Sequence, residues 1–185
     1  MKKNIIYWII TGLLIYGLTS CNNSGNKKTN DISVNAEQST PESSQINSNI
    51  NISNSSLYHH LSAWLSIDRQ GSLEWLKQND QAMYYYTCSD LGVDGNNSLE
   101  WLKNNNKDLY YFSCAEMGID RNGALEWLQQ NNLGLYHRVC AGGLGIHRSE
   151  SLDWLKQNNL GLYYHACAGG LGIDRRGALK WLKEH

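Results

Sequence analysis

Cysteine and histidine are the residues of this chain most able to bind metals, form disulfides or act as nucleophiles. Four cysteines recur 26, 26 and 27 residues apart: Cys88, Cys114, Cys140 and Cys167. Equivalent positions in neighbouring helical units lie roughly 9–10 Å apart, whereas the two Cα atoms of a disulfide lie within about 7 Å of each other. The spacing therefore predicts four unpaired cysteines, each buried in its own unit. Disulfide pairing and a metal or reactive role are the alternatives.

Metal binding and hydrolytic chemistry have little support in the spacing of these residues. His137 and Cys140, and likewise His165 and Cys167, could share a metal, but neither spacing recurs in the other units. The patterns that position zinc ligands or a serine nucleophile, such as CxxC, HExxH and GxSxG, do not occur in the sequence. We therefore expect no metal, no cofactor and no enzymatic activity.

An aromatic series with the same period is the best candidate for a binding surface. The tyrosine four residues before each cysteine is constant and is predicted to be core: Tyr84, Tyr110, Tyr136 and Tyr163. The next position varies slightly, as Tyr85, Tyr111, His137 and Tyr164. The position after that varies freely, as Tyr86, Phe112, Arg138 and His165. Free variation of the last set inside a fixed repeat, by residues that interfaces favour, predicts contact with solvent or a partner, and the slightly varying set beside it is included in the predicted binding surface. An ordinary half-buried face is the alternative.

These residues belong to a unit that is used several times. Five tryptophans keep the same period, at spacings of 26, 26, 27 and 27 residues: Trp75, Trp101, Trp127, Trp154 and Trp181. A common period in this range indicates a repeat array, and repeat arrays mostly present extended binding surfaces. The tryptophans recur in every unit, which favours a place in the core.

The unit at residues 94–119 predicts two short antiparallel helices. Asp94 and Asn106 are N-cap residues that start the two helices, and Gly118 ends the second one as a C′ glycine. Ile119 follows this glycine and is expected to pack back on the helix, as in a Schellman motif. Extra glycines at 142–143 and 169–170 account for the longer spacing of the later units. The sequence therefore predicts ten helices in an all-α solenoid with a repeat of 26–27 residues.

The later units resemble the Sel-like repeat, a relative of the tetratricopeptide repeat. The resemblance rests on three segments: Leu160-Gly161-Leu162-Tyr163-Tyr164, Gly172-Ile173-Asp174 and Ala178-Leu179-Lys180-Trp181. It covers two units well and the earlier ones poorly, because Gly161 has no glycine counterpart there. The resemblance implies a right-handed helical solenoid that acts as an adaptor, and it implies no catalytic residue.

Residues 1–21 are predicted to be an export signal. Lys2 and Lys3 precede an apolar stretch, residues 5–18, that is short for a membrane span. The stretch ends in Leu18-Thr19-Ser20-Cys21, which resembles the lipobox of bacterial lipoproteins and implies lipidation of Cys21. Asn22 in place of aspartate implies sorting to the outer membrane if the host is Gram-negative. An ordinary signal peptide followed by an incidental cysteine is the alternative.

Composition divides the rest of the chain into a tether and a folded domain. Residues 22–56 are dominated by Asn and Ser and lack aromatic residues, which predicts a disordered segment. Residues 57–185 form the repeat domain. Residues 57–132 hold 5 basic and 10 acidic side chains, and residues 133–185 hold 7 and 4, which an open array would carry as an end-to-end dipole. The acidic excess argues against nucleic acid as the main partner.

These observations predict a lipid-anchored protein of the cell envelope that binds another envelope or secreted protein as a scaffold, adaptor or inhibitor. The alternative is a binder of peptidoglycan or another cell-wall glycan through Tyr and Trp surfaces. An envelope hydrolase is a third class. An open groove lined by aromatic residues would favour the glycan binder, a closed pocket with a perturbed acid would favour the enzyme, and a varied concave face would favour protein binding.

Overall fold

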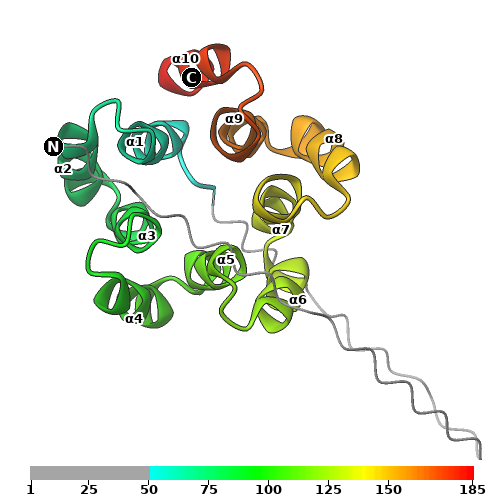
Figure 1. The fold of residues 1–185 in the computed structure, drawn as a ribbon, viewed down its shortest axis with the longest axis horizontal. Coiled ribbons are helices and arrows are strands. Elements are labelled where there is room, and N and C mark those ends of the chain that lie inside the picture. Colours follow the sequence, from blue (N-terminus) through cyan, green and yellow to red (C-terminus); the bar gives the residue numbers. More distant parts are fainter. Residues whose placement is uncertain (1–50) are drawn as a thin grey trace, which may run out of the picture. The chain divides into compact units, whose positions relative to one another are not determined.

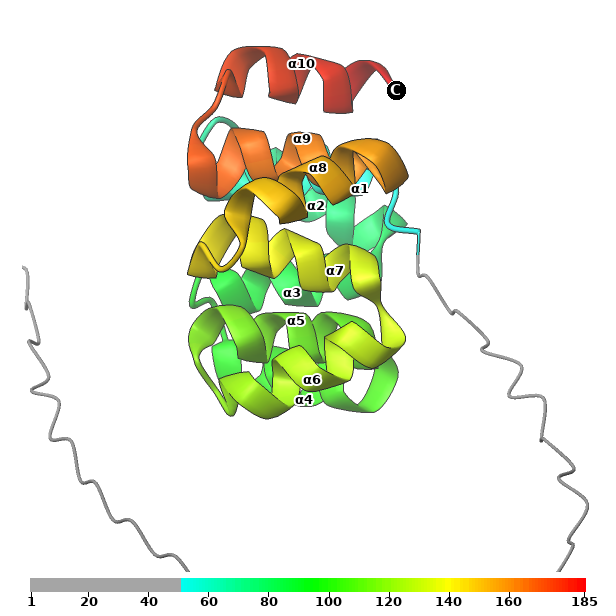
Figure 2. The ribbon, with the colours of Figure 1, turned by 90° about the vertical axis from the view of Figure 1, so that its right-hand side faces the viewer.

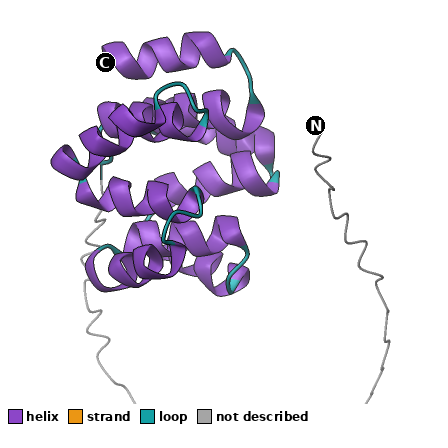
Figure 3. Ribbon diagram, turned by 60° about the vertical axis from the view of Figure 1, so that its left-hand side comes forward, coloured by secondary structure: helices purple, strands orange, loops and turns teal. Residues whose placement is uncertain are grey.

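The computed structural model describes residues 51–185, and within this range the chain is all-α, as predicted (Figure 3). The helices are α1 (Asn54–Trp64), α2 (Arg69–Asn79), α3 (Gln81–Asp90), α4 (Gly95–Asn105), α5 (Lys107–Met117), α6 (Arg121–Asn131), α7 (Leu133–Val139), α8 (Arg148–Asn158), α9 (Leu160–Ala166) and α10 (Arg175–Glu184). Two π-helical turns, η1 (Cys140–Leu144) and η2 (Cys167–Leu171), continue α7 and α9. Cys21 and nearly all of the predicted tether lie outside the described residues.

One residue joins each even-numbered helix to the odd-numbered helix that follows. Between α4 and α5 this residue is Asn106, whose side chain accepts a hydrogen bond from the Leu109 amide at 3.0 Å. The preceding Asn105 donates from its side chain to the carbonyl of Trp101 at 2.8 Å. A polar pair thus satisfies the end of one helix and the start of the next. The same arrangement recurs at Asn131–Asn132 and Asn158–Asn159.

The turns from odd-numbered to even-numbered helices contain the predicted glycine stops. Gly92, Gly118, Gly145 and Gly172 all have φ between 62° and 79°, which is the left-handed region that glycine enters without steric cost. The amide of Ile119 donates to the carbonyl of Cys114 at 2.9 Å, as a Schellman motif requires. The predicted helix ends are therefore confirmed.

A one-residue insertion in the last two units is absorbed by the π-helical turns. Both turns have the sequence Cys-Ala-Gly-Gly-Leu, at residues 140–144 and 167–171. The amide of Ile173 bonds to Cys167, one residue further back than the bond from Ile119 to Cys114. A π turn takes up one extra residue without shifting the rest of the helix, so the longer spacing leaves the helix pairs in register.

The ten helices form a closed ring of five pairs (Figure 1). The odd-numbered helices form the inner layer, in which each helix contacts the next and α9 contacts α1. Each even-numbered helix lies outside, against two odd-numbered helices, and α10 closes the outer layer against α9 and α1. Fully buried leucines from the outer helices fill the space between the layers: Leu76, Leu102, Leu128, Leu155 and Leu182. Burial of each contributes roughly 1.5–3 kcal/mol.

Closure of the ring differs from the open array expected from the sequence. The first and last pairs touch, and a Cβ atom at Gly161 of α9 would meet Asn54 and Leu57 of α1. The end-to-end charge dipole of a linear array therefore does not arise, because the acidic and basic halves adjoin. The physical reason is cumulative: the rotations between neighbouring pairs have the same sense and add up to a full turn over five pairs.

All five odd-numbered helices finish at the same end of the ring, which we call the mouth end. They run parallel because each is followed by an antiparallel outer helix that returns the chain to the other end. Figure 2 shows the turn from α9 to α10 and the start of α1 at opposite ends. The described chain therefore enters the ring at the end opposite the mouth.

The turn of the first pair offers a matched test of the glycine stops. Ser66 has φ 58° at the place where the other four units have glycine. We predict that Ser66→Gly stabilises the protein by about 0.5–1 kcal/mol, because it removes left-handed strain. Gly118→Val should destabilise it by about 1–3 kcal/mol for the opposite reason. Urea unfolding measures both changes, and an unaltered midpoint in both variants would contradict these backbone conformations.

Ring closure can be tested directly by NMR. The imidazole rings of His60 and His165 have centroids 5.1 Å apart, although they belong to the first and last pairs. We predict a nuclear Overhauser effect between their ring protons in a histidine-labelled sample. The variant His60→Gln should remove the cross-peak and so assign it. Its absence in the native chain, with both signals resolved, would mean that the array is open.

Candidate functional site at the ring axis

The four freely varying residues predicted to face solvent lie on the ring axis instead. Tyr86, Phe112, Arg138 and His165 are only 2%, 2%, 5% and 1% exposed, so the expectation of an open contact surface is wrong. His60 occupies the same place in the first unit and is 3% exposed. We call these five the axial residues. Each of them meets unlike residues from the other units, so their identities are set by these contacts and need not match.

The flanking residues predicted to bind a partner join the two helices of each unit. Tyr85 of α3 stacks on Trp101 of α4, with ring centroids 4.3 Å apart. The other predicted residues form equivalent stacks: Tyr111–Trp127, His137–Trp154 and Tyr164–Trp181. The tryptophan covers one face of each half-buried ring, so these residues pack the unit. They do not form the open aromatic groove that would favour a glycan binder.

Sequence reasoning missed the residues one turn beyond the axial positions. Trp64, Asp90 and Glu116 stand four residues after the axial residues of the first three units, on the same helical face. Asp90 and Glu116 lie in the last turns of α3 and α5, where the helix dipole disfavours a negative charge. An acid at such a place destabilises its helix, and this was the signal from which a site could have been predicted.

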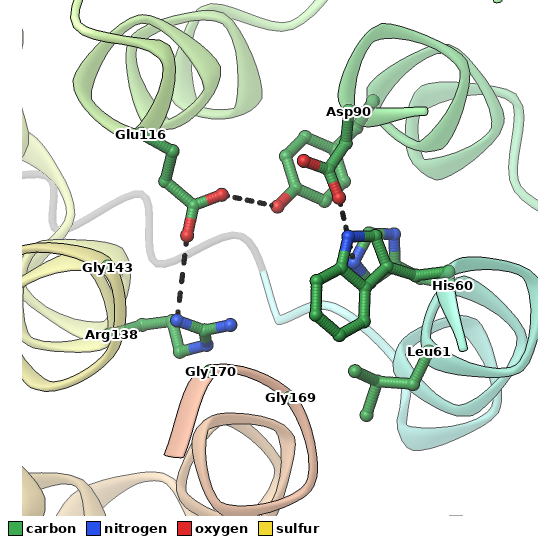
Figure 4. A pocket seen from close by; sticks show the side chains of 10 residues that line it. His60, Leu61, Asp90, Glu116, Arg138, Gly143, Gly169 and Gly170 are labelled. Atoms are coloured by element: carbon green, nitrogen blue, oxygen red, sulfur yellow. Dashed lines mark hydrogen bonds and ion pairs between the residues drawn. The ribbon is translucent and has the colours of Figure 1, made fainter. Parts of the chain in front are cut away.

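A cavity of about 170 Å³ lies between these side chains and the axial residues (Figure 4). It is lined by residues from all five pairs: His60, Leu61, Trp64, Tyr86, Asp90, Glu116, Arg138, Gly143, Gly169 and Gly170. The last two units contribute only glycine beyond the axial position. At Gly142 a Cβ atom would overlap Nη1 of Arg138, so glycine there makes room for the guanidinium group. The glycines keep one side of the cavity open.

Glu116 is held in the cavity by two axial residues. The Tyr86 hydroxyl donates to its Oε2 at 2.7 Å, and Nη1 of Arg138 lies 3.6 Å from its Oε1 (Figure 4). Arg138 Nε also donates to Nδ1 of His165 at 2.8 Å. Arg138 Nη1 and His165 Nε2 are buried without a hydrogen-bond partner among the residues described. The charges of Glu116 and Arg138 thus offset each other. Within residues 51–185, two nearby nitrogen donors remain without an acceptor.

His60 and Asp90 face each other as two hydrogen-bond acceptors. The Thr87 hydroxyl donates to the carbonyl of Met83 at 2.6 Å, so it accepts the 3.1 Å bond from Nδ1 of His60. Burial, and then the nearby Arg138, lower the pKa of His60 to about 3. The imidazole is therefore neutral at pH 7, and its Nε2 carries no proton. This nitrogen lies 3.8 Å from Oδ2 of Asp90, which is too long for a hydrogen bond.

Asp90 is consequently the uncompensated charge of the cavity. Burial, and then the neighbouring Glu116, raise the pKa of Asp90 to about 6, while Arg138 acts in the opposite direction. The carboxyl is still mostly ionised at pH 7. Because Arg138 offsets Glu116 and His60 is neutral, the cavity carries one net negative charge. A partly buried carboxylate with a perturbed pKa in a cavity is typical of a functional site.

Five aliphatic residues lie in the turns at the mouth end, outside the lining of this cavity, and we call them the mouth rim. They are the residues that follow the C′ glycine, or Ser66, in each unit: Ile67, Val93, Ile119, Ile146 and Ile173. The sequence predicted that the residue after each C′ glycine packs back on the helix. Ile119 does line a hollow with Tyr110 and Cys114 of α5, but all five side chains remain 42–57% exposed. The backbone forms the Schellman bond without burying the side chain. One end of the ring therefore combines a polar centre with an apolar edge.

The four repeated cysteines are buried and unpaired, as predicted. Burial is the largest cause that raises the pKa of each thiol. A raised pKa keeps the thiol protonated at neutral pH, and a thiol is a poor nucleophile compared with a thiolate. The geometry therefore supports a packing role for these residues.

Wider features of the chain add few constraints on function. In residues 51–185, no group of three or more His, Cys, Asp or Glu side chains is placed to hold a metal ion. None of the described helices is both long and apolar enough to cross a membrane. No protein-family model, no curated protein and no solved structure matches the chain. The function is therefore inferred from the geometry of the ring.

Replacing Asp90 with asparagine should stabilise the protein at neutral pH. Its pKa of about 6 in the folded chain, against an ordinary 3.8, means that the folded state loses stability as pH rises through this interval. We predict that Asp90→Asn raises the free energy of unfolding by about 1–3 kcal/mol at pH 7.5, and that the gain disappears near pH 4. Urea unfolding across this pH range checks the prediction.

The matched control is Asp153→Asn, which removes an exposed carboxylate from α8 far from the axis. It should change the free energy of unfolding little at either pH. A gain from Asp90→Asn that is the same at pH 4 and pH 7.5, or that the control reproduces, would contradict the raised pKa of Asp90.

Proposed function

We propose that this chain is a lipid-anchored protein of the bacterial cell envelope, and that its helical domain binds another protein at the mouth end of the ring. The mouth rim is the observation that carries the proposal. Single exposed aliphatic residues are common, but here the same position is exposed in all five units, in turns at the same end of the ring. Apolar side chains gathered at one place on a surface mark sites of protein interaction.

The polar cavity would make binding specific for one partner, which apolar contacts at the rim cannot do alone. Uncompensated charge and unused hydrogen-bond donors discriminate strongly between partners, because a wrong partner leaves them unpaired. Trp64 stands at the cavity and is 41% exposed, and tryptophan is enriched among the residues that dominate binding energy. The partner-binding residues first predicted from the sequence thus contribute chiefly through Tyr86 and Arg138, which line the cavity.

The proposed anchor is compatible with binding at this end. The lipobox-like segment ending at Cys21 supports export and lipidation, and a tether that joins the ring before α1 would reach it at the end opposite the mouth. We further propose that the five helix pairs are copies of one 26–27-residue unit, closed on itself, and that the domain serves as a scaffold, adaptor or inhibitor of its partner.

Asp90 supports a second candidate, a hydrolase that acts on an envelope polymer. A carboxyl group with a pKa of about 6 beside a second carboxylate resembles a general acid and its neighbour. The geometry favours this function less, because Glu116 is engaged by Tyr86 and Arg138. The cavity is also smaller than the roughly 300–1,000 Å³ of typical ligand pockets. Release of soluble fragments from purified peptidoglycan, abolished by Asp90→Asn, would establish the hydrolase.

Site-specific photocrosslinking in intact cells tests the binding proposal. A photoreactive residue is placed at Ile119 or Ile146 on the mouth rim of the full chain. The matched control is position Lys107, which is exposed at the opposite end of α5. We predict discrete crosslinks to a protein from the rim positions and none from the control. The triple variant Val93→Lys, Ile119→Lys, Ile146→Lys should reduce crosslinking from a label at Ile173 by at least about tenfold.

Helicity measured by circular dichroism should be unchanged in the triple variant, because these side chains are exposed. Equal crosslinking from position 107, or capture that survives the three lysines, would place the interface elsewhere on the ring. Labels that react with lipid instead of protein would make the mouth a membrane contact and would also contradict the proposal.

A further inference from the structure

The charge balance of the cavity leaves a position for a cation. Glu116 has Arg138 beside it and accepts from Tyr86, whereas the only described side chain placed to pair with Asp90 is the neutral His60. The inner helices also end at the mouth, so the negative ends of their dipoles converge there. A positive group is therefore favoured at Asp90 by the nearest charge and by the surrounding backbone.

The geometry of His60 and Asp90 fits a donor that reaches both. Nε2 of His60 belongs to a side chain that is 4% exposed, lines the cavity and has its lone pair unused. A nitrogen at hydrogen-bond distance, about 2.8–2.9 Å, can contact two acceptors that stand 3.8 Å apart. A water molecule could bridge them as well, but it would leave the charge of Asp90 uncompensated. An ammonium group satisfies both requirements.

Trp64 and the glycines complete the surroundings of such a group. The indole of Trp64 lines the same cavity and is partly exposed, and a tryptophan face attracts ammonium ions. A Cβ atom built at Gly170 would lie 3.6 Å from the backbone of Gly142, and Gly143, Gly169 and Gly170 line this side of the cavity without side chains. An unbranched alkyl chain ending in an ammonium group can enter along it.

We infer that the protein bound at the mouth places a lysine side chain in the central cavity, with its ammonium group between Asp90 and His60 and against Trp64. This inference rests on the proposed function and names the group that the ring recognises. Lysine fits better than arginine, because a guanidinium fork matches two oxygens of one carboxylate. Here the two acceptors belong to different side chains, and Arg138 already occupies the opposite wall.

The test uses a lysine analogue, so it does not depend on knowing the partner. The full chain is titrated with Nα-acetyl-lysine methylamide while the Trp64 indole and His60 imidazole signals are followed by NMR. We predict saturable shifts of both signals with Kd on the order of 1 mM, as for a small fragment. The Nε-acetylated analogue has the same shape without the charge and should bind at least about tenfold more weakly.

Two variants and a control locate the binding. Asp90→Asn and Trp64→Ala should each weaken binding of the lysine analogue about tenfold or more. Asp90→Asn is expected to fold well, since it removes an unfavourable charge, and Trp64 is partly exposed. Asp153→Asn removes the same charge outside the cavity and should leave binding unchanged. Binding should also weaken below about pH 6, where Asp90, which faces His60, Tyr86, Glu116 and Arg138, becomes protonated.

The outcomes separate this inference from the proposed function. No saturable shift up to about 50 mM analogue, equal binding of the acetylated analogue, or retention of binding in Asp90→Asn would each overturn the lysine site. Rim crosslinks to a protein could still appear in that case, and the proposed function would stand. If the analogue binds as predicted but the rim yields no protein crosslink, the cavity takes a free amine and the proposed protein partner is wrong.

Discussion

Closure of the inner helices around one axis is the constraint on which the rest of the structure depends. Each odd-numbered helix contacts two neighbours, and the last of them contacts the first. The side of every inner helix that faces away from the outer layer must therefore point at the ring axis, where it meets the other inner helices. Residues that pack within a unit can be alike in all five units, and each unit has a tryptophan stacked on a tyrosine or histidine. Residues on the axis fill one shared volume together, so they need not match.

The same closure creates the electrostatic character of the mouth. Parallel inner helices bring their C-terminal ends together, and an isolated helix pair would disperse this negative potential into water. Asp90 and Glu116 add two carboxylates where the field already opposes them. Arg138 offsets one of them, Glu116, from the neighbouring inner helix at 3.6 Å. An arrangement that leaves the other charge uncompensated is unfavourable for stability alone, and this cost is what motivates the binding site that we propose at the mouth.

A one-residue insertion shapes the cavity without disturbing the ring. The π turns η1 and η2 absorb it next to the axis, which is where such turns commonly accompany function. They bring paired glycines to the wall of the cavity, and the glycine at 142 makes room for the Arg138 guanidinium. The fourth and fifth units therefore supply both Arg138, which pairs with Glu116, and the glycines that line the open side of the cavity.

The sequence by itself determined what depends on neighbouring residues. The Asn106 cap, the Gly118 stop and the unpaired Cys114 follow from side-chain chemistry acting within a few residues or from a constant period. Two local predictions deviate. α1 begins at Asn54, three residues before the predicted domain, because Ser53 caps it. Asp94 precedes α4 as predicted, but its backbone is left-handed at φ 53° and its side chain makes no capping hydrogen bond.

Only the tertiary structure decided which residues lie together inside the ring. The periodicity shows that Arg138 and His165 occupy equivalent positions on the inner helices. It does not show whether the side of the helix that carries them faces solvent or the ring axis. The answer depends on the rotation between successive pairs, which arises from packing across whole interfaces and has no local signature. His60 and His165 are the clearest case, since residues from the two ends of the domain stack at 5.1 Å solely because five rotations close the ring.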